Sequence, residues 1–380
     1  MKKCVIIPDS FKGTMSSIEV CEVIRSKVKT FYPECEIITV PVADGGEGTV
    51  DCFLHALHAK KITVEVVGPY NEPMECYYAR HNNTAIIEMA QNAGLPLVEG
   101  RENPALTTTY GTGLMIKKAI EDGCNNIILG LGGSCTNDAG VGAAAAVGVR
   151  FYDEEDQVFL PTGNTLSKIK RIDTTKAKAL LQDIKLTAMC DIDNPMYGTS
   201  GAAYIFGFQK GADQKMVEQL DANLRALSKT IIEDLGMDVS AIPGAGAAGA
   251  MGAGVVAFLG GTLKSGIHTI LDLIQFDEMI ENADLIFTGE GKIDGQSLRG
   301  KVVIGIAERA KKKSIPVVAI VGAIGEEAEK AYKMGVSSIF SINRAAIDYE
   351  ISRHHSKENL AATIDSLMRF YKIGQCGDEI

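Results

Sequence analysis

Apolar runs alternate with amphipathic stretches at both ends of the chain. Near the start, strands are predicted at Lys3–Pro8 and Glu36–Val42, and helices with apolar residues at helical spacing at Ser16–Thr30 and Gly48–Leu57. The same style returns after residue 280, where strands are predicted at 284–288, 316–321 and 337–342 and a last helix at 359–371. This alternation is typical of an open, mostly parallel sheet covered by helices.

The middle of the chain has a different pattern. Three runs that alternate like exposed strands, at 61–67, 75–80 and 84–89, form a meander, and later strands are predicted at Asn126–Leu131 and Ile184–Cys190. We therefore predict an α/β protein of two domains. Residues 1–60 with 282–380 would form a Rossmann-like domain from both chain ends, and residues 61–281 an inserted α/β domain with glycine-rich loops. A cleft between two such domains is a usual ligand site.

Composition narrows the function classes. The 380 residues carry a net charge of −10 with no long basic run, which argues against a nucleic-acid partner. Nine cysteines without C-x-x-C spacing favour reduced thiols, and the first apolar run is too short for a signal peptide, so we expect a cytoplasmic protein. Residues 244–261 are uncharged and long enough for a membrane span, but they are mostly Gly and Ala; we predict a loop and a buried helix. Monomer and homodimer both stay open.

Polar loops follow the first two predicted strands. The first contains Asp9, Ser10 and Lys12, and the second, ADGGEGT, contains Asp44 and Glu47 among three glycines. If both strands lie in one parallel sheet, both loops emerge at its carboxyl edge, where ligands bind in open α/β sheets. Lys12 would face an anion and Asp9 or Ser10 a hydroxyl. The alternative is a polar loop that only caps a helix.

A third loop leads from the strand at 126–131 into a predicted helix at 138–149. Its sequence, GLGGSCTND, combines glycines that let the backbone approach a ligand closely with side-chain and backbone donors. Helix N-termini of this kind bind phosphate. We favour anion binding over a simple glycine-rich helix start, and the candidate residues are Gly132, Gly133, Ser134, Thr136 and Asn137.

Two aspartates follow the strand at 184–190. Asp191 and Asp193 have strand spacing, so they share one face of an extended chain. Paired carboxylates at a strand end suit a magnesium ion or a general base. The alternative is an Asx turn before Pro195.

Two glycine patterns match known motifs incompletely. Residues 244–249, GAGAAG, match a dinucleotide fingerprint but follow a poor strand and lack the acid expected about twenty residues on. Residues 295–301 match P-loop spacing, but Val302 replaces the magnesium-binding hydroxyl residue. A helix N-terminus with Arg299 and Lys301 nearby could still hold phosphate. The stretch just before it, with Glu290, Lys292 and Asp294, is too polar and too rich in glycine for a simple connection. All six histidines lie outside these loops, so histidine-driven catalysis is not expected.

Together, DSFKG, PVADGGEGT, LTTTYGTG, LGGSCTNDAG, CDIDNP, FGFQKGA, PGAGAAGAMGAG, FTGEGKIDGQSLRGK and VVAIVGA resemble the glycerate kinase type 1 family, in order and across nearly the whole chain. The resemblance implies ATP-dependent phosphorylation of D-glycerate, in bacterial members usually at the 2-hydroxyl to give 2-phosphoglycerate. It also implies two α/β domains with an active-site cleft. A kinase for a different small hydroxy acid, a NAD-dependent dehydrogenase using the GAGAAG loop and a non-catalytic sensor of sugar acids are the alternatives.

The resemblance gives the candidate residues roles, because phosphoryl transfer depends on positioning, Mg²⁺ and cations. Asp191 is the hypothetical general base, with Asp193 and Asp44 as partners of Mg²⁺ or a substrate hydroxyl. Lys12 would neutralise the substrate carboxylate or the transferring phosphoryl group. The residues expected to cradle the phosphates of ATP are Gly132, Gly133, Ser134, Thr136 and Asn137. The remaining substrate-binding candidates are Asp9, Ser10, Glu47, Glu290, Asp294 and Lys301.

Overall fold

The computed structural model describes residues 1–11, 13–43, 45–46, 48–295, 297–345 and 348–375. Three predicted site residues, Lys12, Asp44 and Glu47, lie outside the described residues. The chain divides into two compact units: unit 1 contains residues 1–44, 55–57 and 267–380, and unit 2 contains residues 45–54 and 58–266. The domain boundaries expected from the sequence stay a prediction.

Unit 1 is built on a five-stranded sheet in the order β14-β13-β12-β1-β2, in which every neighbouring pair is parallel. The predicted α/β class with a parallel sheet is confirmed. The strands are β1 (Lys3–Ile6), β2 (Glu36–Thr39), β12 (Leu285–Ile293), β13 (Val317–Ile324) and β14 (Ser338–Ser341).

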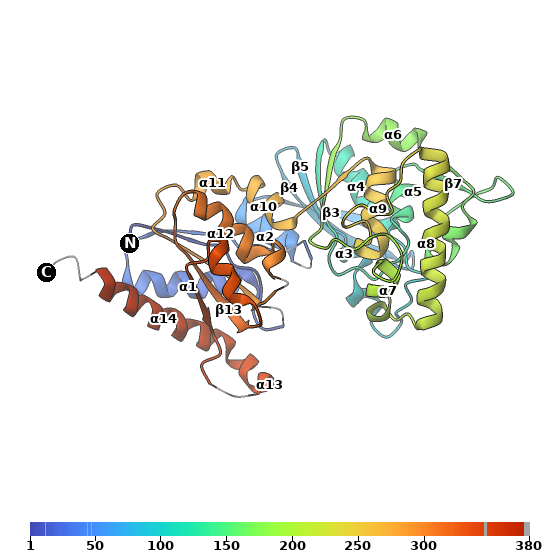
Figure 1. Cartoon of the computed structure of the whole chain (residues 1–380). Coiled ribbons are helices and arrows are strands. Elements are labelled where there is room, and N and C mark those ends of the chain that lie inside the picture. The colour runs from blue at the N-terminus through green and yellow to red at the C-terminus, as the bar shows by residue number, and fades with distance from the viewer. Residues whose placement is uncertain (12, 44, 47, 296, 346–347, 376–380) are drawn as a thin grey trace. The chain divides into compact units, whose positions relative to one another are not determined.

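Helices cover this sheet. Two of them, α1 and α14, lie side by side and pack on the face that carries Cys4 and Ile6 (Figure 1). The helices of this unit are α1 (Ser17–Phe31), α11 (Phe276–Met279), α12 (Val302–Lys312), α13 (Tyr349–Ser352) and α14 (Ser356–Gln375), with 3₁₀ turns at Ser297–Arg299, Ala328–Met334 and Arg353–His355. Two further helices, α2 (Thr49–Ala56) and α10 (Gly266–Leu273), include residues of both units.

The start of α1 shows how the sequence fixes an element boundary. Ser16 precedes the helix, and its hydroxyl accepts a hydrogen bond from Glu19 N–H, while the Glu19 carboxylate accepts from Ser16 N–H at 3.0 Å. This reciprocal capping box satisfies backbone donors that a helix start leaves open. It places the apolar stripe that includes Val20, Ile24 and Val28 against the sheet.

Unit 2 contains a six-stranded sheet in the order β11-β10-β6-β5-β4-β3 and a small antiparallel sheet in the order β8-β7-β9. In the large sheet β11, β10, β6 and β5 run parallel, and β4 and β3 complete it as an antiparallel edge. The strands are β3 (Lys60–Val67), β4 (Pro73–His81), β5 (Thr84–Glu88), β6 (Asn126–Gly130), β7 (Arg150–Tyr152), β8 (Val158–Phe159), β9 (Arg171–Asp173), β10 (Lys185–Met189) and β11 (Thr262–Lys264).

The longest helix among the described residues is α8 of unit 2 (Figure 1), and its buried stripe packs on the rest of the unit. The helices of this unit are α3 (Ala90–Ala93), α4 (Tyr110–Glu121), α5 (Val141–Ala146), α6 (Thr175–Leu181), α7 (Ala202–Phe206), α8 (Gln214–Leu235) and α9 (Ala247–Leu259), with 3₁₀ turns at Leu95–Val98, Gly163–Lys168 and Phe208–Lys210.

One strand is longer than predicted. The expected strand at 284–288 continues as β12 to Ile293, because Glu290 and Lys292 pair with β13 opposite Val321 and Ala323. Gly289 is needed in this strand, since a Cβ there would lie 2.0 Å from the carbonyl oxygen of Ile320. Glu290 therefore lies within the sheet of unit 1 and not in a loop.

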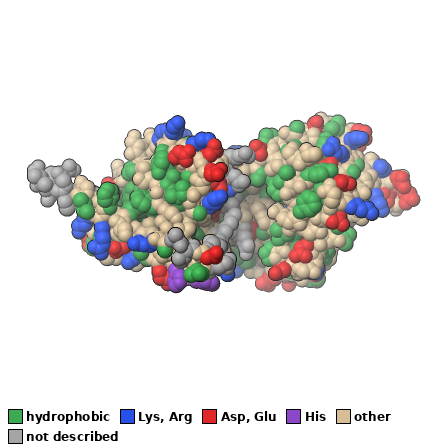
Figure 2. Space-filling model, turned by 60° about the horizontal axis from the view of Figure 1, so that its bottom comes forward, with side chains coloured by type: hydrophobic (Ala, Val, Ile, Leu, Met, Phe, Trp, Pro, Cys, Tyr) green, Lys and Arg blue, Asp and Glu red, His purple; other side chains and the backbone are tan. Residues whose placement is uncertain are grey.

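The surface carries mixed charge. On the face shown in Figure 2, Lys and Arg side chains are mixed with Asp and Glu side chains. Within the part of the chain that the structure describes, no helix combines the length and the apolar character needed to cross a bilayer. The Gly- and Ala-rich residues 244–261 form a loop and the buried helix α9, as predicted.

Candidate active site

In unit 1, the predicted site residues gather around Glu290. Asp9 follows β1, and its backbone N–H donates to the carbonyl of Gly289 at 2.8 Å, next to Glu290 on the neighbouring strand. Asp294 and Lys301 follow β12, and both are close enough to Glu290 to act on its charge. The structure thus brings Asp9, Glu290, Asp294 and Lys301 together at the carboxyl edge of the parallel sheet. Ser10 lies beside them, and its N–H donates to the Asp9 carboxylate at 2.6 Å.

Glu290 is a buried acid. Its side chain is 6% exposed, and its Oε1 atom has no hydrogen-bond partner among the described residues. Burial, with smaller contributions from the carboxylates of Asp9 and Asp294, raises the pKa of Glu290 to about 7 against the opposing effects of Ser297 and Lys301. A carboxyl group that titrates near neutral pH is typical of sites that hold or transfer protons.

In unit 2, the glycines of the two predicted ligand loops pack against each other. The N–H of Gly132 donates to the carbonyl of Gly45 at 3.0 Å. A Cβ at Gly130 would lie 2.5 Å from the Gly45 oxygen, and one at Gly132 would lie 2.6 Å from Gly46 Cα. These glycines are therefore required for the loops to meet. Gly133, the next residue of the loop, is exposed and has a left-handed φ of 75°.

The polar side chains that follow Gly133 are buried. Ser134 is 5% exposed, Thr136 0% and Asn137 1%. The Thr136 hydroxyl and both polar atoms of the Asn137 amide have no hydrogen-bond partner among the described residues. Buried polar groups without partners are costly, so this segment has unused capacity to bind a polar group.

Asp191 and Asp193 follow β10 at the same sheet edge, since Met189 of β10 and Gly130 of β6 are paired in register. The Oδ1 atom of Asp191 accepts a hydrogen bond from Gly266 N–H at 2.9 Å, which fixes the orientation of this carboxylate. Asp193 is exposed, whereas Asp191 is half-buried. The pair is thus one anchored and one accessible carboxylate.

Among the residues with described positions, no three His, Cys, Asp or Glu side chains form a group that could hold a metal ion. Mg²⁺ in kinases is usually held by one or two carboxylates together with substrate phosphates. An exposed carboxylate such as Asp193 fits that kind of site, because its oxygens are hard donors within reach of solvent.

The GAGAAG stretch is used for internal packing. A Cβ at Gly246 would lie 2.3 Å from the carbonyl oxygen of Pro195, and one at Gly249 would lie 2.0 Å from that of Thr136. Ala248, Gly249 and Ala250 all have left-handed φ angles inside α9. These close contacts support the packing interpretation of the motif and leave no cradle for a dinucleotide.

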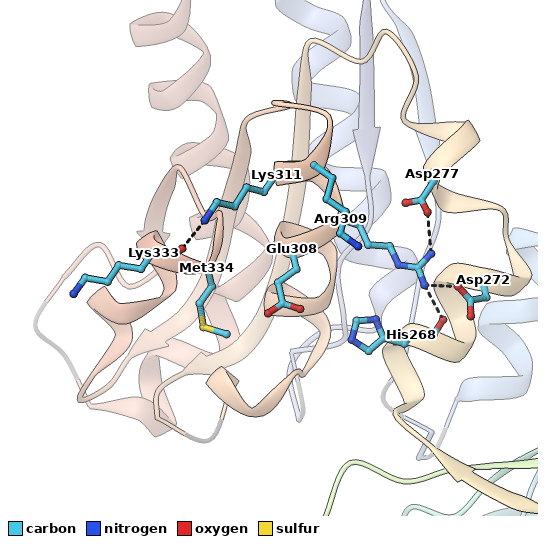
Figure 3. Close-up of a pocket in the computed structure, with 9 residues that line it drawn as sticks. His268, Asp272, Asp277, Glu308, Arg309, Lys311, Lys333 and Met334 are labelled. Carbon is cyan, nitrogen blue, oxygen red and sulfur yellow. Dashed lines mark hydrogen bonds and ion pairs between the residues drawn. The ribbon is translucent and has the colours of Figure 1, made fainter.

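Unit 1 also has a charged cavity of about 810 Å³ at the C-terminal end of α12 (Figure 3). Its most buried cation, Arg309, is held by Asp272, by Asp277 at 3.4 Å and by the carbonyl of His268. The N-terminal end of this helix follows Lys301. At a rise of 1.5 Å per residue, it lies about 16 Å from the C-terminal end. The cavity is therefore separate from the acids around Glu290.

A model of the glycerate kinase family matches residues 4–372. A glycerate kinase of Bacillus cereus is 44% identical over 374 residues, which cover 98% of each chain.

The chain belongs to the glycerate kinase family.

Other relatives agree with this assignment. Glycerate 2-kinase of Escherichia coli is 40% identical over 343 residues, 90% of each chain. A crystal structure of a provisional glycerate kinase 2 from Salmonella typhimurium LT2 superposes with a TM-score of 0.87 at 36% identity, covering 98% of this chain and 99% of that one. The predicted family is confirmed, and with it the expectation that the protein is a kinase.

Lys210 is a further residue of this family member that the sequence did not single out. Its side chain is 3% exposed, and its Nζ donates to the Ser134 hydroxyl and to the carbonyl of Thr136, both at 2.8 Å. Burial lowers the pKa of Lys210 to about 8, against opposing effects of Cys135 and Asp138. A buried cation therefore anchors the predicted phosphate loop from inside. The motif FGFQKGA carried the lysine, but nothing in the sequence placed it beneath that loop.

Two buried acids hold the neighbouring turns. Asp138 accepts hydrogen bonds from the N–H and hydroxyl of Thr109, both at 2.8 Å, and from the N–H groups of Gly140 and Gly142. Burial raises the pKa of Asp138 in opposition to these bonds. Glu88, at the end of β5, accepts from the N–H groups of Gly48 and Val50 and so caps the start of α2. Neither role has a spacing signature that would reveal it in the sequence.

Proposed function

We propose that the protein transfers the γ-phosphoryl group of ATP to the 2-hydroxyl of D-glycerate, giving 2-phosphoglycerate and ADP. The match to the glycerate kinase family over residues 4–372 carries the proposal. Support for the 2-hydroxyl comes from the name of the E. coli relative, glycerate 2-kinase. The GAGAAG glycines are occupied by internal packing, so no observation favours a dehydrogenase.

Asp191 is proposed as the general base. Its Oδ1 is held by Gly266 N–H, and a fixed carboxylate can accept the hydroxyl proton as the oxygen attacks phosphorus. The proton moves to the carboxylate, the new O–P bond forms, and the bond between the γ-phosphorus and the bridging oxygen of ADP breaks. Lys12 is proposed to balance the charge of the substrate carboxylate or of the transferring group.

The phosphates are proposed to bind beside the loop from Gly132 to Asn137. Three observations support this binding site: the exposed backbone at Gly133, the buried cation Lys210 behind the loop, and the polar atoms of Thr136 and Asn137 that have no hydrogen-bond partner among the described residues. In unit 1 the N-terminus of α12, which begins after Lys301, offers a second set of backbone donors.

Mg²⁺ would be held by Asp193 and Asp44 together with ATP phosphates, and it would neutralise charge on the transferring group. Asp9, Ser10, Glu47, Glu290 and Asp294 are proposed to bind the hydroxyls of glycerate. We also propose that the two units are two domains whose residues act on the same pair of substrates.

A substrate panel tests the reaction. ADP release would be measured with ATP and Mg²⁺ and with D-glycerate, L-glycerate or a four-carbon hydroxy acid. We expect D-glycerate to give the highest kcat/KM; activity confined to the four-carbon acid would replace the substrate and keep the kinase. Asp191→Asn should lower kcat by roughly a hundred- to ten-thousand-fold if Asp191 is the base. Asp193→Asn is the matched variant, and a larger loss there would move the base to Asp193.

A further inference from the structure

Unit 2 contains a cavity of about 660 Å³ that no proposed catalytic residue explains. It is bounded by the start of α2, by β4 and by the segment from Ala90 to Leu97, and it reaches Gly133 of the proposed phosphate loop. Its volume is within the range of small-molecule sites, roughly 300–1,000 Å³. The cavity also touches Glu88 at the carboxyl end of β5, which is the sheet edge where ligands bind in α/β folds.

Part of the cavity lining is apolar. The side chains of Cys76, Leu95, Pro96 and Leu97 form it, and Ala90 adds a small methyl group. Leu95 and Leu97 are only half-buried, and Pro96 is exposed, although all three are apolar. The 3₁₀ turn Leu95–Val98 holds them in place. A planar aromatic ring would cover this part of the lining and remove apolar area from water.

The lining also offers a few oriented polar groups. The Oε1 atom of Gln91 accepts a hydrogen bond from Tyr77 N–H at 3.0 Å, and this bond orients the amide. Its NH₂ group then has no hydrogen-bond partner among the described residues and can donate to a ring nitrogen. The Tyr77 hydroxyl donates to Asp51 Oδ1 at 2.9 Å, which leaves Asp51 Oδ2 and the exposed Glu75 as acceptors for hydroxyl groups.

The charge of the lining selects which part of a nucleotide fits. Asp51, Glu75 and Glu88 line the cavity, and no Lys or Arg of the described chain does. Three carboxylates repel a triphosphate, and the two exposed ones, Asp51 and Glu75, can accept hydrogen bonds from the hydroxyls of a ribose. The phosphates must therefore lie outside the cavity, on the side where Gly133 connects it to the loop that Lys210 supports.

The cavity wall and the phosphate loop form one continuous piece of structure. Leu95 N–H donates to the carbonyl of Gly133 at 2.9 Å, and Cys135 N–H donates to the carbonyl of Ala93 at 2.8 Å. Gly94 and Ser134 form an isolated antiparallel bridge between these bonds. A ligand that spans both places would thus meet a fixed geometry.

We propose that this cavity binds the nucleoside part of ATP. The purine would lie on Leu95–Leu97 with a ring nitrogen accepting from the Gln91 amide. The ribose hydroxyls would face Asp51 and Glu75, and the phosphates would leave past Gly133. The assignment rests on the proposed function only in taking ATP as the phosphoryl donor.

The test compares a ligand with and without the nucleoside. Calorimetric titration of the full chain with Mg-ATP and with magnesium tripolyphosphate gives one Kd for each probe. Gln91→Leu removes one hydrogen bond and should raise the Kd of ATP roughly tenfold. Ala90→Phe fills the cavity and should raise it further. Gln91→Leu should leave the Kd of tripolyphosphate unchanged, and Leu106→Phe, at an exposed position that does not line the cavity, should change neither Kd.

Each other outcome is decisive. Unchanged ATP affinity in both cavity variants, or equal weakening of both probes by Gln91→Leu, would overturn the assignment. Equal wild-type affinity for ATP and tripolyphosphate would also overturn it, because the nucleoside would then contribute nothing. A wild type that shows the expected Kd pattern but does not phosphorylate D-glycerate would overturn the proposed function and leave the nucleoside site standing. A wild type that binds no ATP would overturn both.

Discussion

Neutralising Glu290 should change how stability depends on pH. Glu290 is buried at the carboxyl edge of the unit 1 sheet, where burial and the carboxylates of Asp9 and Asp294 raise its pKa from 4.5 to about 7. A raised pKa means that the folded chain binds the proton more tightly than the unfolded chain. The stabilising contribution is therefore complete below pH 4.5 and is lost as the pH rises through about 7.

The magnitude follows from the two pKa values. Between pH 5 and pH 8 a single group with pKa values of 4.5 unfolded and about 7 folded lowers the free energy of unfolding by about 2–3 kcal/mol. Glu290→Gln cannot ionise, so it should not show this loss. Between pH 5 and pH 8, the free energy of unfolding of Glu290→Gln should therefore rise by about that amount relative to the free energy of unfolding of the wild type.

Urea unfolding followed by far-UV circular dichroism at pH 5 and pH 8 measures the difference directly. Glu326→Gln is the matched control, because it neutralises an exposed glutamate of the same unit. Its free energy of unfolding should follow that of the wild type. Parallel pH dependences for the wild type and Glu290→Gln would refute the argument that Glu290 is held in a desolvated site among like charges.

Three further changes test other parts of the structure. Lys210→Met leaves the Ser134 hydroxyl and the Thr136 carbonyl without their donor, which costs about 1–3 kcal/mol. Hydrogen exchange in peptides covering residues 130–140 should therefore accelerate roughly ten- to hundredfold. Unchanged exchange would contradict the anchoring role. Gly249→Ala should lower the free energy of unfolding by about 1–3 kcal/mol more than Gly236→Ala. Both glycines have a left-handed φ, but only at Gly249 would the added Cβ lie within 4 Å of other backbone atoms. Equal losses in urea titrations would contradict this. Asp138→Asn should destabilise the chain by about 1–3 kcal/mol, because an NH₂ group replaces an acceptor of buried N–H bonds; an unchanged unfolding midpoint would be inconsistent with that network.

Much of the fold could be predicted because local signals coincide with tertiary packing. The Ser16–Glu19 capping box and the apolar stripe behind it mark α1, and the apolar run before Asp191 marks β10. The end of β12 could not be predicted in this way, since GEGKI has the composition of a loop. It is a strand because its backbone pairs with β13, a contact distant in sequence.

The candidate site was only partly predictable for the same reason. Acids and glycines at strand ends indicated where a ligand would bind, and the parallel registers bring the expected residues of each unit together. The glycines of the 45–46 and 130–132 segments have a second purpose, the contact between two loops, that only the structure reveals. The motif FGFQKGA contains Lys210 but gives no sign of its role, because that role depends on a loop 74 residues earlier in the chain.

The position of the phosphate on the product tests the central claim most directly. The wild-type chain would be incubated with Mg-ATP and D-glycerate, and the product examined by proton-coupled phosphorus NMR. Phosphate on the 2-hydroxyl couples to the single hydrogen on its carbon and should appear as a doublet beside the signals of ADP. A triplet, from phosphate on the 3-hydroxyl with two such hydrogens, would contradict the proposed 2-kinase. Unconsumed ATP with no phosphate ester would contradict glycerate as the substrate.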